Sequence, residues 1–159
     1  MLWASNISRH TVLQESVPEW LTYFSVGAVT GCLCAARAFY LRTFNKTLKY
    51  FANAFMGGFV LGCVTALNCF DVYVYLFADN VISYASDYDV VFPGPSVGKT
   101  GRCEAGLWLK DRHTNRSIQL CTNKDALYLN RKQGMTGVWV TARVNTIGSY
   151  IVDYRFIYR

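Results

Sequence analysis

The chain has 159 residues, of which 52% are hydrophobic and 16% are charged, and its net charge is +6 at neutral pH. Soluble domains carry about 25% charged residues, so this composition argues against a wholly soluble protein. The basic balance favours anionic lipid head groups or another anionic partner. With two histidines and no C-x-x-C pair, the sequence argues against a closed zinc site, and we expect no metal and no cofactor.

Residues 1–19 form the first predicted segment, an N-terminal tail. They contain no long apolar run, because Glu15, Pro18 and Glu19 interrupt it. A signal peptide needs such a run, so the apolar block that follows is predicted to remain in the protein as an anchor.

Two apolar blocks follow, at about 20–41 and 50–77. Roughly 20 apolar residues are needed to cross the core of a bilayer, and both blocks are long enough. We therefore predict a transmembrane helical hairpin over residues 20–78. A buried hairpin of a soluble protein is the alternative, but the remaining chain is too short to cover two such helices.

Small residues recur at four-residue spacing in both blocks, which places them on one face of each helix. Close packing of helices in lipid depends on such residues. The simplest interpretation is contact within the hairpin, and the alternative is pairing between subunits of a homo-oligomer. The predicted packing positions are Gly27, Gly31, Gly58, Gly62 and Ala66.

Asn68 and Asp71 form a polar stripe on the second block. An aspartate facing bare lipid at the bilayer centre costs about 2.5–3.5 kcal/mol, so the stripe either lines an oligomer or pore, or lies at the head-group boundary. We favour the boundary, where Asp71 is simply hydrated, because the aromatic residues Tyr73, Tyr75 and Phe77 that follow are typical of an interfacial belt.

The loop between the blocks is basic, whereas acids dominate the stretch after the second block. Arg37, Arg42, Lys46 and Lys49 lie in or beside this loop. The positive-inside rule then places the loop in the cytoplasm and both termini outside, in a periplasm-like compartment of a bacterial inner membrane. Arg9 and the basic C-terminal region count against this orientation.

Residues 79–101 are predicted to be a linker, since Pro93, Gly94, Pro95 and Gly98 are turn signals. The segment 94–100 falls one residue short of a phosphate-binding loop and is not followed by a helical pattern. His113 lies beside Asp111, but no activated serine or cysteine is near it in the pattern. We therefore predict no catalytic residues and no enzyme activity.

Residues 102–159 show the alternation of β-strands, at about 106–110, 117–121, 138–144 and 150–158. Four strands in so short a segment predict a small antiparallel β-barrel-like domain of the OB or SH3 kind. The fold class is thus a membrane α + β protein. Cys103 and Cys121 flank the first strand pair and are predicted to form a disulfide if the domain is extracytoplasmic. Two free thiols are the alternative.

From Lys99 onward, eleven bases outnumber four acids, with aromatic residues between them. Such a domain can bind an anionic partner by charge and stacking, although the same pattern arises when aromatics fill a barrel and bases face water. We take as ligand-binding candidates Trp139, Arg143, Arg155 and Arg116. Asp153 is expected to pair with an arginine, and the opposite face, with Val140, Val144, Val152 and Phe156, is expected to be core.

The leading hypothesis is a small non-enzymatic membrane protein whose β-domain binds a protein partner or a membrane surface, in an envelope, immunity or exclusion role. The alternative is a ligand-gated membrane effector whose β-domain is cytosolic and binds an anionic ligand such as a nucleotide. The expected partners are a lipid bilayer, further copies of the chain and a protein or small anion, but no nucleic acid polymer.

Overall fold

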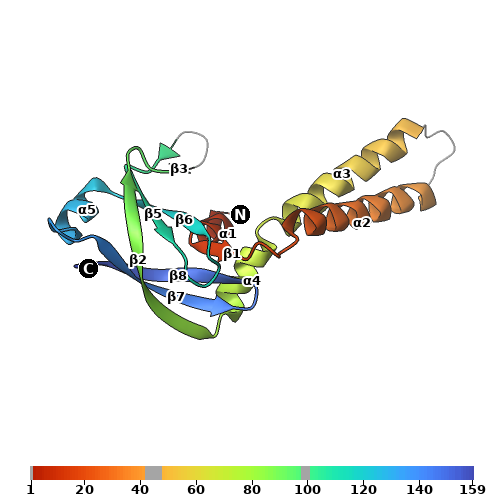
Figure 1. The fold of residues 1–159 in the computed structure, drawn as a ribbon. Helices are drawn as coiled ribbons and strands as arrows, with labels where there is room; N and C mark the ends of the chain where they lie inside the picture. The colour runs from red at the N-terminus through yellow and green to blue at the C-terminus, as the bar shows by residue number, and fades with distance from the viewer. Residues whose placement is uncertain (1, 42–47, 98–100) are drawn as a thin grey trace. The chain divides into compact units, whose positions relative to one another are not determined.

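The computed structural model describes residues 2–41, 48–97 and 101–159 (Figure 1). The chain forms two compact units, which we describe separately. The hairpin unit is Pro18–Cys69, and the β-unit combines Met1–Val17 with Phe70–Arg159. The sequence therefore divides differently from the prediction, because most of the residues expected to form a tail belong to the β-unit.

The hairpin unit consists of two helices, α2 (Glu19–Tyr40) and α3 (Leu48–Ala66). Residues 42–47, which include Arg42 and Lys46 of the predicted basic loop, lie outside the described residues. The buried positions of the two helices are small residues, and they coincide with the predicted packing positions: Gly27, Gly31, Gly58, Gly62 and Ala66.

The helix backbones approach closely at these glycines. A Cβ atom on Gly58 would lie 2.7 Å from the backbone oxygen of Thr30, and one on Gly62 would lie 2.9 Å from that of Val26. The hydroxyl of Thr30 is 2.9 Å from the Val26 oxygen in its own helix and 2.9 Å from the Gly58 oxygen in the other. Small side chains allow this approach, and a polar group then links the two helices.

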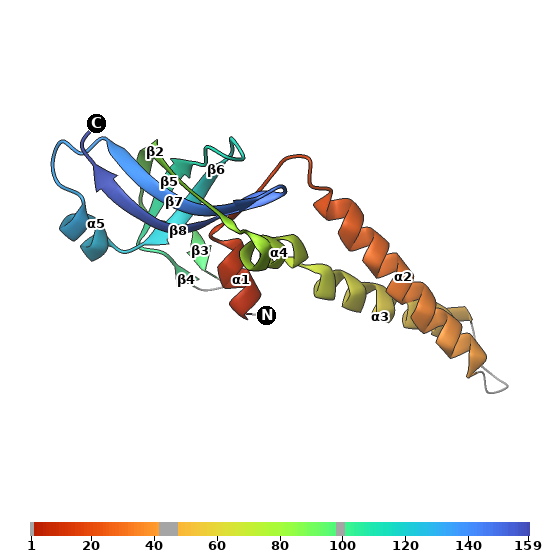
Figure 2. The same cartoon turned by 90° about the horizontal axis from the view of Figure 1, so that it is seen from below.

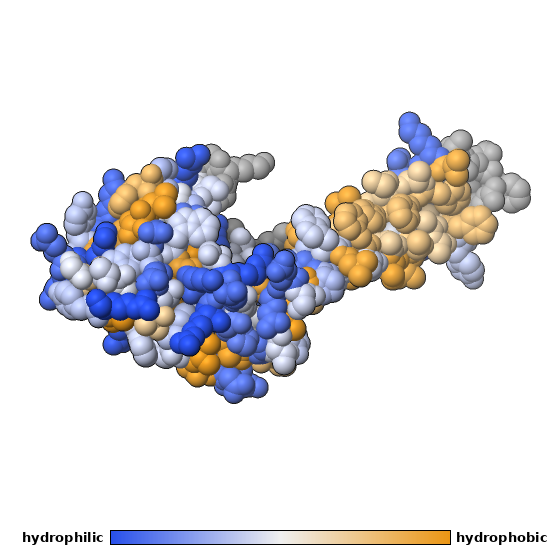
Figure 3. Space-filling model, viewed as in Figure 1, coloured by the Kyte–Doolittle hydropathy of each residue, from blue (hydrophilic) through white to orange (hydrophobic). Residues whose placement is uncertain are grey.

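Large apolar side chains cover the outside of the hairpin unit, which is the apolar surface visible in Figure 3. Both candidate spans, Glu19–Tyr40 and Leu48–Phe77, are long and apolar enough to cross a membrane, and in the apolar 18-residue stretch that qualifies each of them only 11% and 22% is buried. The core helices of a soluble protein bury their apolar side chains instead. Exposed examples are Trp20, Leu21, Phe24, Val29, Leu33, Val60 and Leu61.

The second predicted helix is not continuous to residue 77, which corrects the sequence-based prediction. It ends at Ala66, and after Leu67 and Asn68 a new helix, α4 (Cys69–Phe77), begins. Asn68 has a positive φ of 61°, a conformation that asparagine tolerates better than most residues. The break changes the direction of the following side chains, and Asp71 is buried rather than hydrated at a boundary.

The β-unit is a nearly closed antiparallel sheet of six strands in the order β1-β8-β7-β2-β5-β6 (Figure 2). Helix α5 (Lys124–Asn130) lies between β6 and β7 in the chain, and a short strand pair, β3 (Ser96–Val97) and β4 (Gly101–Arg102), precedes β5. Residues 98–100, part of the rejected phosphate-loop pattern, lie outside the described residues. The six strands are β1 (Thr11–Leu13), β2 (Asn80–Val91), β5 (Ala105–Lys110), β6 (Ser117–Thr122), β7 (Gly137–Asn145) and β8 (Gly148–Ile157).

Strands β5 to β8 agree with the four predicted strands, whereas β2 occupies much of the predicted linker, 79–101. β2 pairs with β7 over 80–87 and with β5 over 88–91. The side chains of β2 that face the core include Ile82, Tyr84 and Val90. Serines and acids lie between these apolar residues, so the sequence did not show a clear strand pattern. Because β2 pairs with strands on both sides, it bends the sheet into a barrel-like form.

The N-terminal residues complete the sheet instead of forming a free tail. After the short helix α1 (Leu2–Ser8), strand β1 pairs with β8, with Thr11 opposite Tyr150. The Ile151 amide donates to the His10 carbonyl at 2.8 Å, and Arg116 Nη1 donates to the Leu13 carbonyl at 3.1 Å. The sequence did not predict this strand, because β1 has only three residues and its partner, β8, lies far away in the chain.

The core lies inside the barrel-like sheet and contains residues from all six strands. The predicted core residues of β7 are buried, and they pack with Leu107 and Leu120. In β8 the prediction fails at Val152, which is 54% exposed, whereas Ile151 is 2% exposed. An irregularity in the β7–β8 pairing explains this, because Thr141 pairs with Asp153 and Ala142 with Ile151, which leaves Val152 as an extra residue.

Cys103 and Cys121 are joined by a disulfide, as the sequence suggested, with a Cα–Cα distance of 5.6 Å. Cys103 precedes β5 and Cys121 lies near the end of β6. The bond therefore fastens the β3–β4 segment to the edge strand of the sheet.

Candidate functional site

A buried carboxylate holds the end of the barrel where β5 turns into β6. The Asp111 side chain is fully buried. Its Oδ1 accepts a hydrogen bond from the Tyr84 hydroxyl at 2.5 Å. Its Oδ2 accepts from the Thr114 amide at 2.9 Å, the Thr114 hydroxyl at 2.6 Å and the Ser149 hydroxyl at 2.7 Å.

These hydrogen bonds determine which groups of the cluster, Asp111 and Tyr84, carry a proton. Burial opposes ionisation of Asp111, but the hydrogen bonds from Thr114, Tyr84 and Ser149 outweigh it and hold the pKa of Asp111 below its ordinary value. Burial and the neighbouring carboxylate raise the pKa of Tyr84, so its hydroxyl stays protonated and donates. The carboxylate is satisfied by protein donors from β2, β8 and its own turn, so its role is to fasten these elements.

A second contact fastens the same end of the barrel. His113 Nε2 lies 2.9 Å from the Asn145 carbonyl, which connects the β5–β6 turn to the β7–β8 turn. The pair His113 and Asp111 therefore has structural partners.

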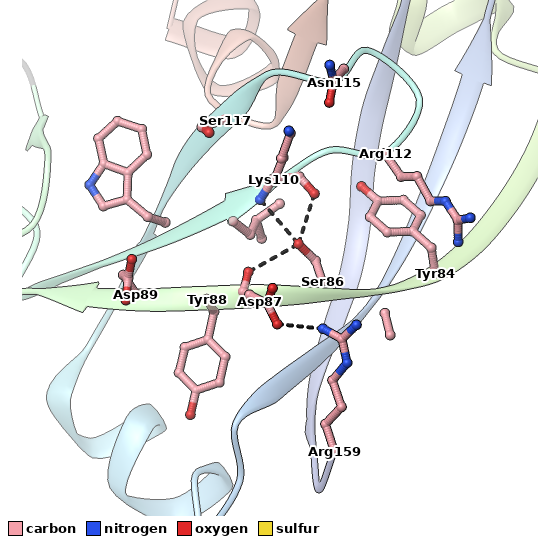
Figure 4. A pocket seen from close by; sticks show the side chains of 13 residues that line it. Tyr84, Ser86, Asp87, Tyr88, Asp89, Lys110, Arg112, Asn115, Ser117 and Arg159 are labelled. Carbon is pink, nitrogen blue, oxygen red and sulfur yellow. Dashed lines mark hydrogen bonds and ion pairs between the residues drawn. The ribbon is translucent and has the colours of Figure 1, made fainter.

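A surface groove of about 610 Å³ lies where β2 leaves β5 (Figure 4). Its floor is set by Ser86, because the Ser86 hydroxyl donates to the Lys110 carbonyl at 3.0 Å and lies 3.3 Å from the Lys110 amide. A side chain thus replaces the ladder hydrogen bonds just beyond the last β2–β5 pair, Tyr88 and Leu109. The strands separate beyond this point, and the groove opens between them.

The walls of the groove carry both signs of charge. Asp87 Oδ1 and Arg159 Nη1 form an exposed ion pair at 2.5 Å. Lys110, Arg112 and Asp89 also line the groove, and within the described residues none of these three has an ion-pair partner. A ligand can therefore offer a carboxylate to the two bases and a cation to Asp89.

Trp108 adds an aromatic surface to the groove. It projects outward from β5, is 39% exposed and lies opposite Gln119 of β6. Exposed tryptophans are enriched among the residues that dominate binding energy at protein interfaces. The groove thus combines a π-surface, three bases and two acids on one open face.

The residues predicted to bind a ligand are divided by the structure. Trp139 and Arg155 are register partners, and with Thr141 and Asp153 they line a separate shallow hollow of about 270 Å³. Asp153 pairs with an arginine, Arg155, at 3.4 Å.

The other two candidates have backbone partners. Arg143 Nε donates to the Ala78 carbonyl at 3.0 Å, and Arg116 donates to Leu13, as described above. Long basic side chains of this kind reach carbonyls that sequence patterns do not reveal. Sequence reasoning overlooked the groove because its residues belong to β2, β5 and the C-terminus, and only tertiary pairing brings Asp87, Lys110 and Arg159 together.

Among residues 2–41, 48–97 and 101–159, no three histidine, cysteine or acidic side chains gather closely enough to hold a metal ion. No family model, curated protein or solved structure matches this chain. The chemistry of the groove and of the hairpin unit is therefore the basis for a functional assignment.

Proposed function

We propose that this protein is a non-enzymatic, membrane-anchored binding protein, whose hairpin unit lies in a lipid bilayer and whose β-unit binds an exposed segment of another protein. The groove lined by Trp108 carries the proposal, because it joins an aromatic surface to unpaired charges of both signs.

The dimensions of the hairpin support the anchor. A helix rises about 1.5 Å per residue, so the 22 residues of α2 and the 19 residues of α3 extend about 33 Å and about 28 Å. The hydrocarbon core of a bilayer is about 30 Å thick. Each helix thus matches one crossing, and its large apolar side chains face outward, where lipid chains would surround them.

The topology of the β-unit supports an OB-type barrel. One long strand, β2, is shared by two strand pairs, and α5 lies between β6 and β7. The barrel approaches closure where the Tyr154 hydroxyl of β8 lies 3.3 Å from the Thr122 hydroxyl of β6. OB-type barrels bind ligands on an open strand face, and the groove lies on such a face, between β2 and β5.

The charges of the groove favour a protein segment over a polyanion. Asp87 and Asp89 lie on the same face as Lys110, Arg112 and Arg159. A nucleic acid backbone would meet both carboxylates and be repelled, whereas a peptide with acidic and basic side chains can satisfy each wall. We therefore propose an extended peptide segment of mixed charge as the ligand.

The side of the membrane is part of the proposal. Stable disulfides occur mainly in oxidising compartments, so the Cys103–Cys121 bond supports a β-unit outside the cytoplasm. The basic residues around the helix connection support the same orientation through the positive-inside rule. A bacterial inner membrane with the β-unit in the periplasm fits both, and the apolar outer faces of the hairpin leave room for homo-oligomers.

Site-specific photo-crosslinking in intact cells tests the binding site. A photoreactive amino acid at position 108 should give one discrete protein adduct, whereas the same amino acid at the exposed position of Leu129 should not. The adduct at 108 should weaken when Lys110→Glu and Arg112→Glu reverse the basic wall, and a charge reversal outside the groove, Lys132→Glu, should leave it unchanged. Identical adducts at both positions, or none at 108, would refute the groove as a binding site.

The alternative, a gated effector with a cytosolic β-unit, is favoured by the separate hollow of Trp139 and Arg155, which suits a small anion. A C-terminal reporter that is active on only one side of the membrane separates the two. Activity in the cytoplasm supports the alternative and contradicts the extracytoplasmic binding protein.

A further inference from the structure

We infer that α1 and α4 form a second membrane contact, in which an aromatic collar, defined here as Trp3, Tyr73, Leu76 and Phe77, inserts into the interfacial layer of the bilayer. The inference rests on the proposed membrane anchor and goes beyond it, because the collar belongs to the β-unit.

The two faces of α4 carry the first argument. One face is buried through Val74, which is 0% exposed, and Asp71, which is 7% exposed, and Ala78, directly after the helix, is also 0% exposed. The opposite face carries Tyr73, Leu76 and Phe77, which are 48%, 54% and 57% exposed. The one charged side chain of the helix therefore points inward, and the outward face is apolar, the reverse of a helix on a water-facing surface.

Helix α1 lies beside α4 and adds a further exposed aromatic side chain. Trp3 is 58% exposed, and its ring meets that of Tyr75 edge-on with a centroid distance of 5.8 Å. Tyr75 in turn packs against Tyr150 of β8 at 5.0 Å, which fastens both helices to the sheet. Helix α1 contains no charged residue, and none of the four collar side chains is charged.

Chain continuity identifies lipid as the occupant. Helix α3 is already long enough for one crossing, and only Leu67 and Asn68 separate its end from α4. The positive φ of Asn68 ends α3 there, so α4 begins at the depth where the crossing is complete. Tryptophan and tyrosine are the side chains that accumulate at this depth, because they combine an apolar ring with a polar group.

Depth-dependent quenching of single-tryptophan proteins tests the collar. The full chain, reconstituted in phosphatidylcholine–phosphatidylglycerol vesicles, would retain only Trp3, only Trp20 or only Trp108, with phenylalanine at the other three tryptophan positions. Spin-labelled lipids carry the quencher near the head groups or deep in the acyl chains. Trp3 should be quenched severalfold more by the shallow label than by the deep one, and Trp108 by neither.

A charge variant adds a second measurement. Leu76→Glu should shift Trp3 emission to the red and reduce its quenching severalfold, whereas Leu129→Glu, at an exposed leucine of α5, should change neither. Circular dichroism of both variants checks that the β-unit remains folded.

The outcomes separate this inference from the proposed anchor. If the shallow label quenches Trp20 but not Trp3, the anchor stands and the collar is wrong. If neither tryptophan is quenched, the anchor itself fails and the collar with it. Blue-shifted Trp3 emission without quenching shows that protein covers the collar, for example a second copy of the chain, and also overturns the inference.

Discussion

The two units of this protein place their residues in opposite ways. The hairpin unit buries glycines and alanine and exposes its tryptophan, leucine and phenylalanine side chains. The β-unit buries Leu107, Val138 and Val140 and exposes most of its charges. In water, burial of large apolar groups stabilises a fold, whereas in lipid close backbone packing takes over that role. The contrast is the one expected if the hairpin unit lies in lipid, as proposed, and the β-unit in water.

The largest effect is expected from a charge in the core of the β-unit. Val140→Asp buries an unpaired carboxylate at a position that is 0% exposed and should cost more than about 4 kcal/mol, enough to unfold the unit. Thr141→Asp, on the outward face of the same strand, is the matched control. Near-ultraviolet circular dichroism of the full chain in detergent measures both. A folded Val140→Asp variant would contradict the assigned core.

In the hairpin unit the second largest effect is expected from a large apolar residue at the helix contact, which the β-unit would accept in its core. Gly62→Leu drives a side chain into the α2 backbone near Val26 and should destabilise the hairpin by about 3 kcal/mol, the upper end for overpacking. Gly57→Leu is the control, because no atom lies within 4 Å of a Cβ there. Thermal denaturation in detergent compares them, and equal midpoints would show that the glycine face is not a packing face.

The buried carboxylate gives the β-unit a stability that depends on pH. Asp111→Asn removes charge-assisted hydrogen bonds and should lower the free energy of unfolding by about 2 kcal/mol at pH 7. Because the pKa of Asp111 is lower in the folded protein than its unfolded value of about 3.9, this contribution is complete above that value. It disappears as the pH falls through the folded pKa.

Urea denaturation of the full chain at pH 7 and pH 3 measures the difference between Asp111→Asn and the unchanged protein. The difference should shrink at pH 3, and a constant difference would show that Asp111 does not act as a carboxylate in the fold.

The smallest effect concerns the arginines of the outer sheet face. Arg155→Ala breaks an exposed pair with Asp153 and should cost less than about 0.5 kcal/mol. Arg143→Ala removes a hydrogen bond to the Ala78 carbonyl and should cost about 1 kcal/mol. Thermal denaturation midpoints of the two variants measure these costs. A larger loss for Arg155→Ala than for Arg143→Ala would show that Arg143 has no structural role and is available for a ligand.

The sequence predicted the parts of the molecule that local patterns define. Alternation located β5 to β8, and four-residue spacing of glycines located the helix contact. Features that depend on one conformation or on distant partners were not predictable: the break at Asn68, the extra residue at Val152, and the pairing of residues 11–13 with β8. The groove belongs to this second group, since Arg159 meets Asp87 only after the barrel forms.

The pairing of β1 with β8 limits how the chain can thread a membrane. The sheet takes Thr11 from before the hairpin and Tyr150 from after it, so both segments must reach the same compartment. A chain that crosses a membrane between these segments must therefore do so an even number of times, and one helical pair gives two crossings. A change that left one helix on the wrong side would also separate the two halves of the sheet. If the hairpin is the proposed membrane anchor, the β-unit can therefore complete its sheet only when both helices have crossed.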